Sequence, residues 1–203
     1  QGVNNNILNK KHEIISNGSC TTNCLAPVAM VLEKNIGIES GFMTTIHSFT
    51  GDQPSVDQTH TDLRRARAAS TAMIPTSTGA AKALSLVLPS LEGKLDGTAI
   101  RVPTPNVSLI DFTFTSKKQT SVDKINKIMI AASKTKGLKN ILTINELPLV
   151  SIDFNHNSSS SIFDLSQTQV INKSFCRILS WYDNEWGFSN RMIDTLLNLK
   201  KLL

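Results

Sequence analysis

The 203-residue sequence lacks the features that mark several classes of protein. No apolar run approaches the roughly 20 residues that a membrane-spanning helix needs. The first residues have neither the basic nor the apolar stretch of a signal peptide. Cysteine occurs only three times, without a spacing typical of disulfide frameworks. We therefore expect a soluble protein of the cytoplasm, with no membrane partner and with its thiols reduced.

Aromatic residues are also scarce, at 5% of the chain, although the formal net charge is +5. Surfaces that bind nucleic acid usually interleave aromatic and basic side chains. The densest basic cluster, residues 64–67, contains three arginines and no aromatic residue. Nucleic acid is therefore not expected as the primary partner, and the charge fits a site for small anions equally well.

A glycine-rich G-x-G-x-x-G motif is missing as well. In dinucleotide-binding domains this motif lets the backbone approach the pyrophosphate at the start of a helix. We therefore expect most of any dinucleotide site to lie outside these residues. The sequence opens on Gln1 rather than on methionine, which favours a longer parent protein.

The residues that are present predict a long helix early in the chain. Apolar residues recur at helical spacing from Thr21 to about Asn35, after a short strand-like run over 13–15. Gly37 is the expected stop signal of this helix. Pro27 lies past the first turn, so it should kink the helix or remove a backbone hydrogen bond unless the helix begins later.

A β-branched and aromatic run over 42–49 predicts a buried strand that carries His47 near its end. The polar stretch over 50–70 is longer than most connections, and such loops are often functional. A helix over 78–88 should follow, with Thr78 as its cap and a first turn suited to an anion.

Two further strands are expected over 98–102 and 107–115, joined as a hairpin-like meander across two prolines. The remaining expected elements are an amphipathic helix over 122–133, strands around 149–152 and 177–181, and a closing helix over 186–199. This order predicts an α+β fold, with a mixed, mainly antiparallel sheet and helices packed on one side.

Cys20 lies where the first long helix should begin. The free N–H groups and the positive end of the helix dipole would favour its thiolate, the nucleophilic form. A buried, inert thiol is the alternative for a cysteine taken alone. We expect Cys24 and Cys176 to be buried thiols and expect no metal site, because no second pair of ligands stands nearby.

His47, at the end of a buried strand, is either hydrogen-bonded filler or an acid-base group. Phosphate is bound by hydroxyls, backbone N–H groups and arginines. The candidates for that role are Thr50, Asp52, the arginines of 64–67, the helix start at Thr78 and Gly79, and Arg101. Each of them also has a structural interpretation, as an ordinary cap, a salt-bridged loop or a solvated face.

Six collinear segments together resemble the phosphorylating glyceraldehyde-3-phosphate dehydrogenases. They are SNGSCTTNC at 16–24, TTIHS at 44–48, DLRRAR at 62–67, IPTSTGAAK at 74–82, RVPTPNV at 101–107 and SWYDNEWG at 180–187. The resemblance covers nearly the whole chain and implies the C-terminal catalytic half of such an enzyme. Residues 1–18 would then end the cofactor domain, 19–183 would form the catalytic domain, and 184–203 would be a helix that packs on the cofactor domain.

The resemblance implies that Cys20 is the nucleophile and that His47 is its base and orienting partner. Cys20 would attack D-glyceraldehyde 3-phosphate, a hydride would pass to NAD, and inorganic phosphate would release 1,3-bisphosphoglycerate from the thioester. The other implied contacts are Thr50, Asp52 and Arg65 for the substrate phosphate, Ser19, Thr21, Thr78 and Gly79 for inorganic phosphate, Arg101 for both, and Asn184 for the nicotinamide amide.

The family resemblance also implies a homotetramer with the 50–70 loop at its centre. Two departures from the family pattern stand out. Gly18 replaces a usual alanine, and Gln58 and Thr59 replace a Leu-Pro pair common in members that use only NAD. The choice between NAD and NADP therefore stays open.

Three alternatives stay open besides this one. An erythrose-4-phosphate dehydrogenase shares the cysteine and arginine segments but resembles the chain less over 76–82. A cysteine hydrolase would use Cys20 and His47 with Asn184 as orienting group. A non-catalytic fragment would only oligomerise, through the 50–70 loop and the apolar face of its last helix.

Overall fold

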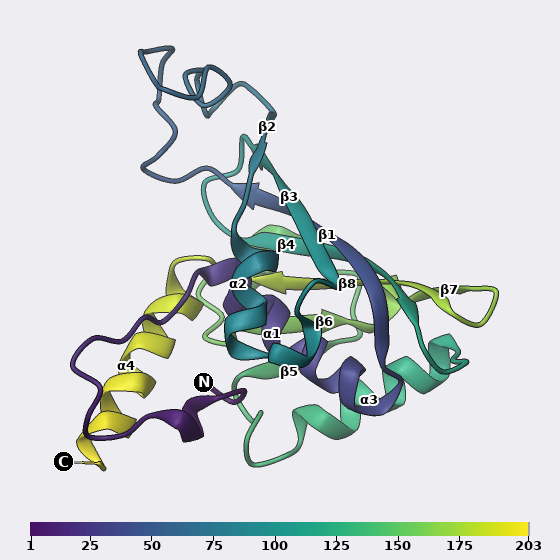
Figure 1. Cartoon of the computed structure of the whole chain (residues 1–203). Helices are drawn as coiled ribbons and strands as arrows, with labels where there is room; N and C mark the ends of the chain where they lie inside the picture. Colours follow the sequence, from purple (N-terminus) through teal and green to yellow (C-terminus); the bar gives the residue numbers. More distant parts are fainter. Residues whose placement is uncertain (203) are drawn as a thin grey trace.

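The computed structural model describes residues 1–202 and contains an eight-stranded mixed sheet covered by helices (Figure 1). Seven strands lie in the order β2-β3-β1-β4-β8-β6-β5, and the short β7 pairs with β8. The strands are β1 (Ile38–Ser48), β2 (Ile74–Ser77), β3 (Leu95–Val102), β4 (Ser108–Ser116), β5 (Leu142–Asn145), β6 (Ser161–Asp164), β7 (Gln169–Ile171) and β8 (Phe175–Tyr182). The helices are α1 (Cys20–Asn35), α2 (Ala80–Val87), α3 (Val122–Ser133) and α4 (Trp186–Lys200). The predicted α+β class is confirmed.

The central strands hold the sheet together. β1 pairs with β3 in parallel and with β4 antiparallel, so it lies between them. The expected hairpin between β3 and β4 is therefore wrong: the long apolar β1 takes the place next to each, and the two prolines over 103–106 carry the chain across it. β8 completes the centre by pairing antiparallel with β4.

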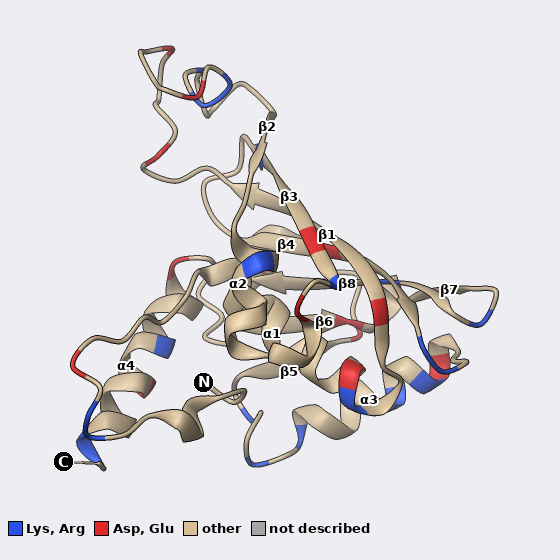
Figure 2. Cartoon of the chain, viewed as in Figure 1, with Lys and Arg blue, Asp and Glu red and all other residues tan. Residues whose placement is uncertain are grey.

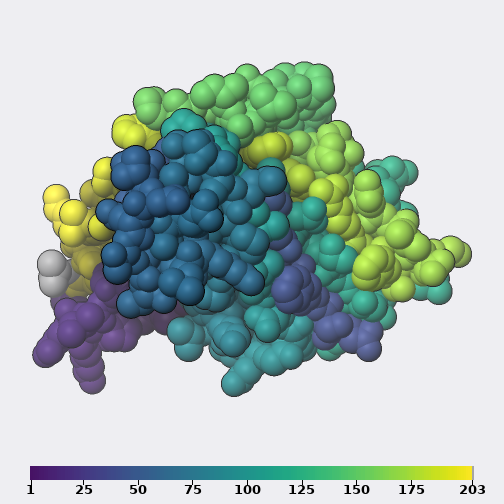
Figure 3. Space-filling view, turned by 90° about the horizontal axis from the view of Figure 1, so that it is seen from above, coloured from purple at the N-terminus to yellow at the C-terminus, as the bar shows by residue number. Residues whose placement is uncertain are grey.

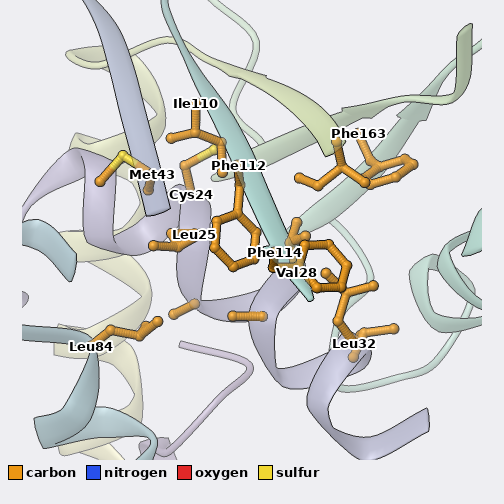
Figure 4. Packing of buried hydrophobic residues seen from close by; sticks show 14 of the residues in the cluster. Cys24, Leu25, Val28, Leu32, Met43, Leu84, Ile110, Phe112, Phe114 and Phe163 are labelled. Carbon is orange, nitrogen blue, oxygen red and sulfur yellow. The ribbon is translucent and has the colours of Figure 1, made fainter. Parts of the chain in front are cut away.

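Helix α1 lies against this sheet and fills the core (Figure 4). Leu25, Val28 and Leu32 of α1 are fully buried and face Phe112 and Phe114 of β4. Apolar residues that recur every three or four positions produce this single buried stripe. The packing fixes the direction of α1, and so the place where its first residue stands.

The ends of α1 follow local chemistry. The Ser19 hydroxyl caps it by accepting from the Thr22 N–H at 3.0 Å. Gly37, with φ +70°, stops it as predicted, since glycine adopts this backbone conformation without strain. The helix continues through the buried Pro27.

Two predicted strands are absent from residues 1–202. Residues 13–15 form no ladder, and the Ile14 side chain is 93% exposed. The stretch over 149–152 instead leads into a 3-10 helix, Ser151–Phe154, because Asp153 accepts from the Val150 N–H at 2.8 Å and closes a turn. Other short 3-10 helices are Asn5–Ile7, Pro89–Leu91 and Leu165–Gln167.

The remaining helices lie where they were expected, except that α2 begins two residues later than predicted and does not have Thr78 at its cap position. α3 has the predicted bounds and is capped by Ser121, and α4 begins at Trp186 as predicted. α2 begins at Ala80 with Gly79 at its cap position, while the Thr78 hydroxyl accepts from the Ala80 N–H at 3.2 Å. No helix within residues 1–202 is long and apolar enough to cross a membrane.

The 50–70 loop contains no helix or strand, as predicted, and projects beyond the ends of β2 and β3 (Figure 1). It carries charges of both signs (Figure 2). Seen from above, its side chains form the dark blue mass on the near face of the molecule (Figure 3). The loop thus lies at the end of the sheet where β1 delivers His47.

Candidate active site

Cys20 and His47 meet at one end of the sheet, although they are 27 positions apart in the chain. The Cys20 Sγ lies 3.5 Å from the His47 Nε2. Cys20 is the first residue of α1, and His47 is the second-last residue of β1, so the packing of α1 against the sheet brings them together. His47 is buried, whereas Cys20 is partly exposed. The two residues that were predicted to pair are therefore adjacent.

The other ring nitrogen of His47 meets two groups. Its Nδ1 lies 2.7 Å from the Ser48 carbonyl oxygen and 2.6 Å from the Arg101 Nη1. Arg101 stands opposite His47 in the parallel β1–β3 register, which places the guanidinium beside the ring. The same Nη1 donates to the Ser48 carbonyl at 3.0 Å.

The electrostatics keep both groups neutral. Burial raises the pKa of the Cys20 thiol, although hydrogen bonds from Thr21 and the charge of Arg101 act in the opposite direction. Burial and the Arg101 charge lower the pKa of His47 to about 4. The backbone at the helix start acts on the Cys20 pKa in the predicted direction, but burial outweighs it together with Arg101.

Tyr182 links the elements that carry the pair, and the sequence reasoning missed it. Its hydroxyl lies 2.8 Å from the Thr21 Oγ1 at the start of α1 and 2.9 Å from the Thr45 Oγ1 on β1. Its ring meets the His47 ring edge to face, with centroids 5.9 Å apart. The sequence feature that could have pointed to it is that the single tyrosine of the chain lies inside the SWYDNEWG segment.

Asn184 joins the same region through two buried serines that were also missed. Its Oδ1 accepts from the Ser48 Oγ at 2.7 Å and from the Ser108 Oγ at 3.0 Å. With the oxygen occupied from inside, the amide NH₂ has a single long contact within residues 1–202, of 3.4 Å to the Glu185 carboxylate. In this orientation the NH₂ group can donate a hydrogen bond to a carbonyl oxygen, such as that of a nicotinamide carboxamide.

The starts of α1 and α2 lie close together. The Thr22 hydroxyl donates to the Ala80 carbonyl at 3.4 Å, which brings Ser19 into the same region as Thr78 and Gly79. The Ser19 hydroxyl is engaged as a cap, and the Thr21 hydroxyl is buried against Tyr182. The Thr21 side chain therefore faces the interior instead of offering a free hydroxyl to an anion.

The loop residues form a second polar cluster. Arg65 Nη1 binds the Asp52 Oδ2 at 2.5 Å, and its Nε donates to the Thr76 Oγ1 at 2.8 Å. The Thr50 N–H donates to the Gln53 side chain at 3.1 Å. Within residues 1–202, no hydrogen bond joins this cluster to Cys20 or His47. Gln53 in turn donates to the Asp52 Oδ2 at 2.9 Å, so Thr50, Asp52 and Arg65 are held together and separately from the pair.

The described part of the chain contains no cluster of side chains suited to binding a metal ion. Among residues 1–202, no group of three or more His, Cys, Asp or Glu side chains is placed to hold a metal ion. Cys24 and Cys176 are buried, and all three cysteines are free thiols.

Comparison with known proteins identifies the family of this chain. The family model described as "Glyceraldehyde 3-phosphate dehydrogenase, C-terminal domain" matches residues 19–184. A glyceraldehyde-3-phosphate dehydrogenase of Xanthobacter flavus is 62% identical over 201 residues, which cover 99% of this chain and 60% of that protein. Those of Cereibacter sphaeroides and Borreliella burgdorferi are 57% and 52% identical, over 100% and 98% of this chain and 60% of each protein.

The chain spans about 60% of the length of these curated relatives. The matched region contains Cys20, His47, Arg101 and Asn184, and so holds the polar network described above. The resemblance inferred from the motifs is confirmed: the chain belongs to the glyceraldehyde-3-phosphate dehydrogenase family and corresponds to its C-terminal domain.

Proposed function

We propose that this chain supplies the catalytic part of an enzyme that oxidises and phosphorylates D-glyceraldehyde 3-phosphate to 1,3-bisphosphoglycerate. The observation that carries the proposal is the 3.5 Å contact between the Cys20 Sγ and the His47 Nε2, with Arg101 on the far side of the ring. A thiol, an imidazole and a cation in this order form a nucleophile, its base and an anion-binding group.

In the proposed reaction, His47 takes the thiol proton and Cys20 attacks the aldehyde carbon. The resulting oxyanion accepts hydrogen bonds from the His47 ring and from the Cys20 backbone N–H, since the first N–H groups of a helix have no partner within the helix. NAD, when bound, supplies the acceptor for the hydride that leaves this carbon. The thioester left on Cys20 is then attacked by inorganic phosphate, which regenerates the thiol.

Two anions must bind for this chemistry, and three groups of residues support their binding. Arg101 lies beside His47 and serves both anions in the proposal. Ser19, Thr21, Thr78 and Gly79 would contribute at the adjoining starts of α1 and α2, with Thr21 acting through its backbone. Thr50, Asp52 and Arg65 would hold the substrate phosphate from the loop, once Arg65 exchanges part of its contact with Asp52 for the phosphate.

Asn184 is the proposed cofactor contact in this chain. Its NH₂ would donate to the carbonyl oxygen of the nicotinamide carboxamide, because its own oxygen already accepts from Ser48 and Ser108. The rest of the NAD site would lie in a part of the protein that the longer relatives possess. NAD or NADP preference would be decided there.

The domain arrangement is part of the proposal. Residues 1–18 would complete a cofactor domain, 19–183 would be the catalytic domain, and 184–203 would pack on the cofactor domain. The exposed apolar side chains of α4 support this: Met192, Ile193, Leu196 and Leu197 are each more than half exposed. We also propose a homotetramer around the 50–70 loop and a cytoplasmic location, as expected for a glycolytic enzyme.

The proposal is tested by joining this chain to the N-terminal part of the Xanthobacter flavus relative, so that the cofactor region is complete. The chimera should reduce NAD with glyceraldehyde 3-phosphate only when inorganic phosphate is present. Turnover without phosphate would favour the hydrolytic chemistry of an erythrose-4-phosphate dehydrogenase. Release of acid from esters without any dinucleotide would favour a cysteine hydrolase and contradict the proposal.

A further inference from the structure

Three strand ends meet around the side chain of Asn184. Ser48 is the last residue of β1, Ser108 is the first residue of β4, and Asn184 lies just beyond the end of β8. β1 and β8 both pair antiparallel with β4, so the sheet itself brings the three side chains together. None of the three residues is more than 5% exposed. Buried polar groups are almost always hydrogen-bonded, so their contacts fix how each group is oriented.

The oxygen of the Asn184 amide is held by both serines. Its Oδ1 accepts from the Ser48 Oγ at 2.7 Å and from the Ser108 Oγ at 3.0 Å. The Ser108 Oγ in turn accepts from the Ser48 backbone N–H at 3.0 Å. A carbonyl oxygen has two lone pairs, and here each of them has a donor. The amide oxygen of Asn184 is therefore satisfied from inside the chain.

The reverse orientation of this amide is disfavoured on both of its sides. An NH₂ group turned inward would leave the two hydroxyl protons without their acceptor, which is costly in a buried site. The amide oxygen of Asn184 would then face the Glu185 Oε1, which now accepts from the NH₂ at 3.4 Å. Both of these oxygens only accept hydrogen bonds. The NH₂ group therefore belongs on the outer side of the cluster.

The backbone of Asn184 is fixed by a different group, the buried carboxylate of Asp183. Its Oδ1 accepts from the N–H groups of Glu185 and Trp186, at 3.0 and 2.7 Å. Its Oδ2 accepts from the His156 N–H at 2.7 Å. Asp183 thus holds the turn that contains Asn184, and the direction of the side-chain amide is left to the serines.

The backbone just before Ser108 is strained. Val107 is buried and has a φ of +69°. A β-branched residue rarely adopts this left-handed conformation, and such strain persists only where the surrounding contacts impose it. The strained residue directly precedes the hydroxyl that reaches Asn184. It therefore supports a role for Ser108 beyond filling space.

We propose that Ser48 and Ser108 are positioning residues, which hold the Asn184 amide with its NH₂ outward so that it only donates to the cofactor. The inference rests on the proposed function, because the group that would accept from this NH₂ is the nicotinamide carboxamide. Without the two hydroxyls the amide is free to rotate, and its NH₂ is aimed at the carboxamide for only part of the time. The serines thus act on cofactor binding, through Asn184.

The first test is ¹⁵N NMR relaxation of the Asn184 side-chain NH₂ in the 203-residue chain, assigned by comparison with Asn184→Asp. In the wild type its order parameter should be close to about 0.85, the value of a rigid backbone. In Ser48→Ala/Ser108→Ala it should fall below about 0.6. The backbone amides of Glu185 and Trp186 should stay rigid in both proteins, because Asp183 still binds them.

The second test uses the chimera described above. Ser48→Ala/Ser108→Ala should raise the KM for NAD by about 10-fold and change kcat by less than about 2-fold, because the lost binding is shared by ground state and transition state. Ser180→Ala is the matched control, since it removes a buried hydroxyl that lies 2.8 Å from the Ser161 Oγ instead. This control should leave KM, kcat and the Asn184 order parameter unchanged.

Several results would overturn the inference. They are an Asn184 NH₂ that is mobile in the wild type, one that stays rigid in the double variant, and an equal loss of order in Ser180→Ala. Loss of order at Trp186 as well would mean that the serines only support the fold. A mobile NH₂ with an unchanged KM for NAD would mean that the orientation does not serve the cofactor.

If the double variant does not fold, the two single variants take its place, with the same expected direction and a smaller change. An inactive chimera would count against the proposed function alone, because the NMR measurements need no turnover.

Discussion

The surroundings of Cys20 and His47 differ from the surface of α4 in how their side chains find partners. Around Cys20 and His47, buried hydroxyls and amides bond one another, as Tyr182 does with Thr21 and Thr45. On α4, by contrast, apolar side chains such as Leu196 stand exposed to solvent. Those hydroxyls have their hydrogen-bond partners within the chain, whereas an exposed apolar face is typical of an interaction surface. The difference indicates that this chain itself forms the surroundings of Cys20 and His47, whereas in the proposed arrangement the exposed face of α4 would pack on the cofactor domain.

The largest effect on activity is expected when the proposed nucleophile is removed. Cys20→Ser in the chimera should lower aldehyde oxidation by on the order of 10⁴-fold or more, because a hydroxyl is a far weaker nucleophile than a thiolate. The measurement is NADH formation, with circular dichroism as the check that the fold is intact. Cys24→Ser, one turn further into the core, is the matched control and should retain most activity. Full activity of the Cys20 variant would contradict the assignment.

The core that positions the site should respond next most strongly. Leu32 is fully buried between α1 and the sheet, and Leu32→Ala should lower the free energy of unfolding by about 2–5 kcal/mol. Urea unfolding of the 203-residue chain measures this change. A loss below about 1 kcal/mol would mean that α1 is not packed as described.

The third prediction concerns pH. His47 has a pKa near 4 in the fold, against an ordinary value near 6.5, so the unfolded chain binds more protons between these values. The stabilising contribution of the neutral ring is complete above about pH 6.5 and is lost as pH falls from 6.5 toward 4, by up to about 3 kcal/mol. Urea unfolding at pH 7 and pH 4.5 should therefore show a smaller acid loss in His47→Gln than in wild type. Equal losses would mean that His47 is not the group responsible.

The smallest effect is expected on the open face. Leu196 is 66% exposed, so Leu196→Ala should change the unfolding free energy of this chain by less than about 0.5 kcal/mol. The same substitution should destabilise the chimera more, because α4 is then covered. The two urea curves provide the comparison. A large loss in the chain alone would show that α4 already packs on its own residues.

Local signals predicted much of the fold. The bounds of α3, the start of α4 at Trp186 and the stop at Gly37 all follow from caps, periodicity or glycine, which act within a few residues. The pairing of β1 between β3 and β4 did not follow, because it joins segments some 60 residues apart and is set by competition among strands. The pattern of apolar residues within one strand does not show which strands will be its neighbours.

The residues of the candidate site also fall into those that the sequence indicated and those that only the structure revealed. Cys20 and His47 were recognisable from motifs, but Ser48, Ser108 and Tyr182 act through contacts that only the folded chain creates. The effect of burial on the Cys20 pKa also escaped the sequence, since a helix start predicts the sign of one contribution and says nothing of desolvation.

The central claim is that this chain by itself brings Cys20 and His47 into one working pair. The most direct measurement is the rate of Cys20 alkylation by iodoacetamide across pH, in wild type and in His47→Asn, with mass spectrometry to identify the modified cysteine. We predict that the apparent pKa of alkylation is higher in His47→Asn, because the thiolate loses the imidazole that accepts its proton. Superimposable pH profiles for the two proteins would contradict the claim.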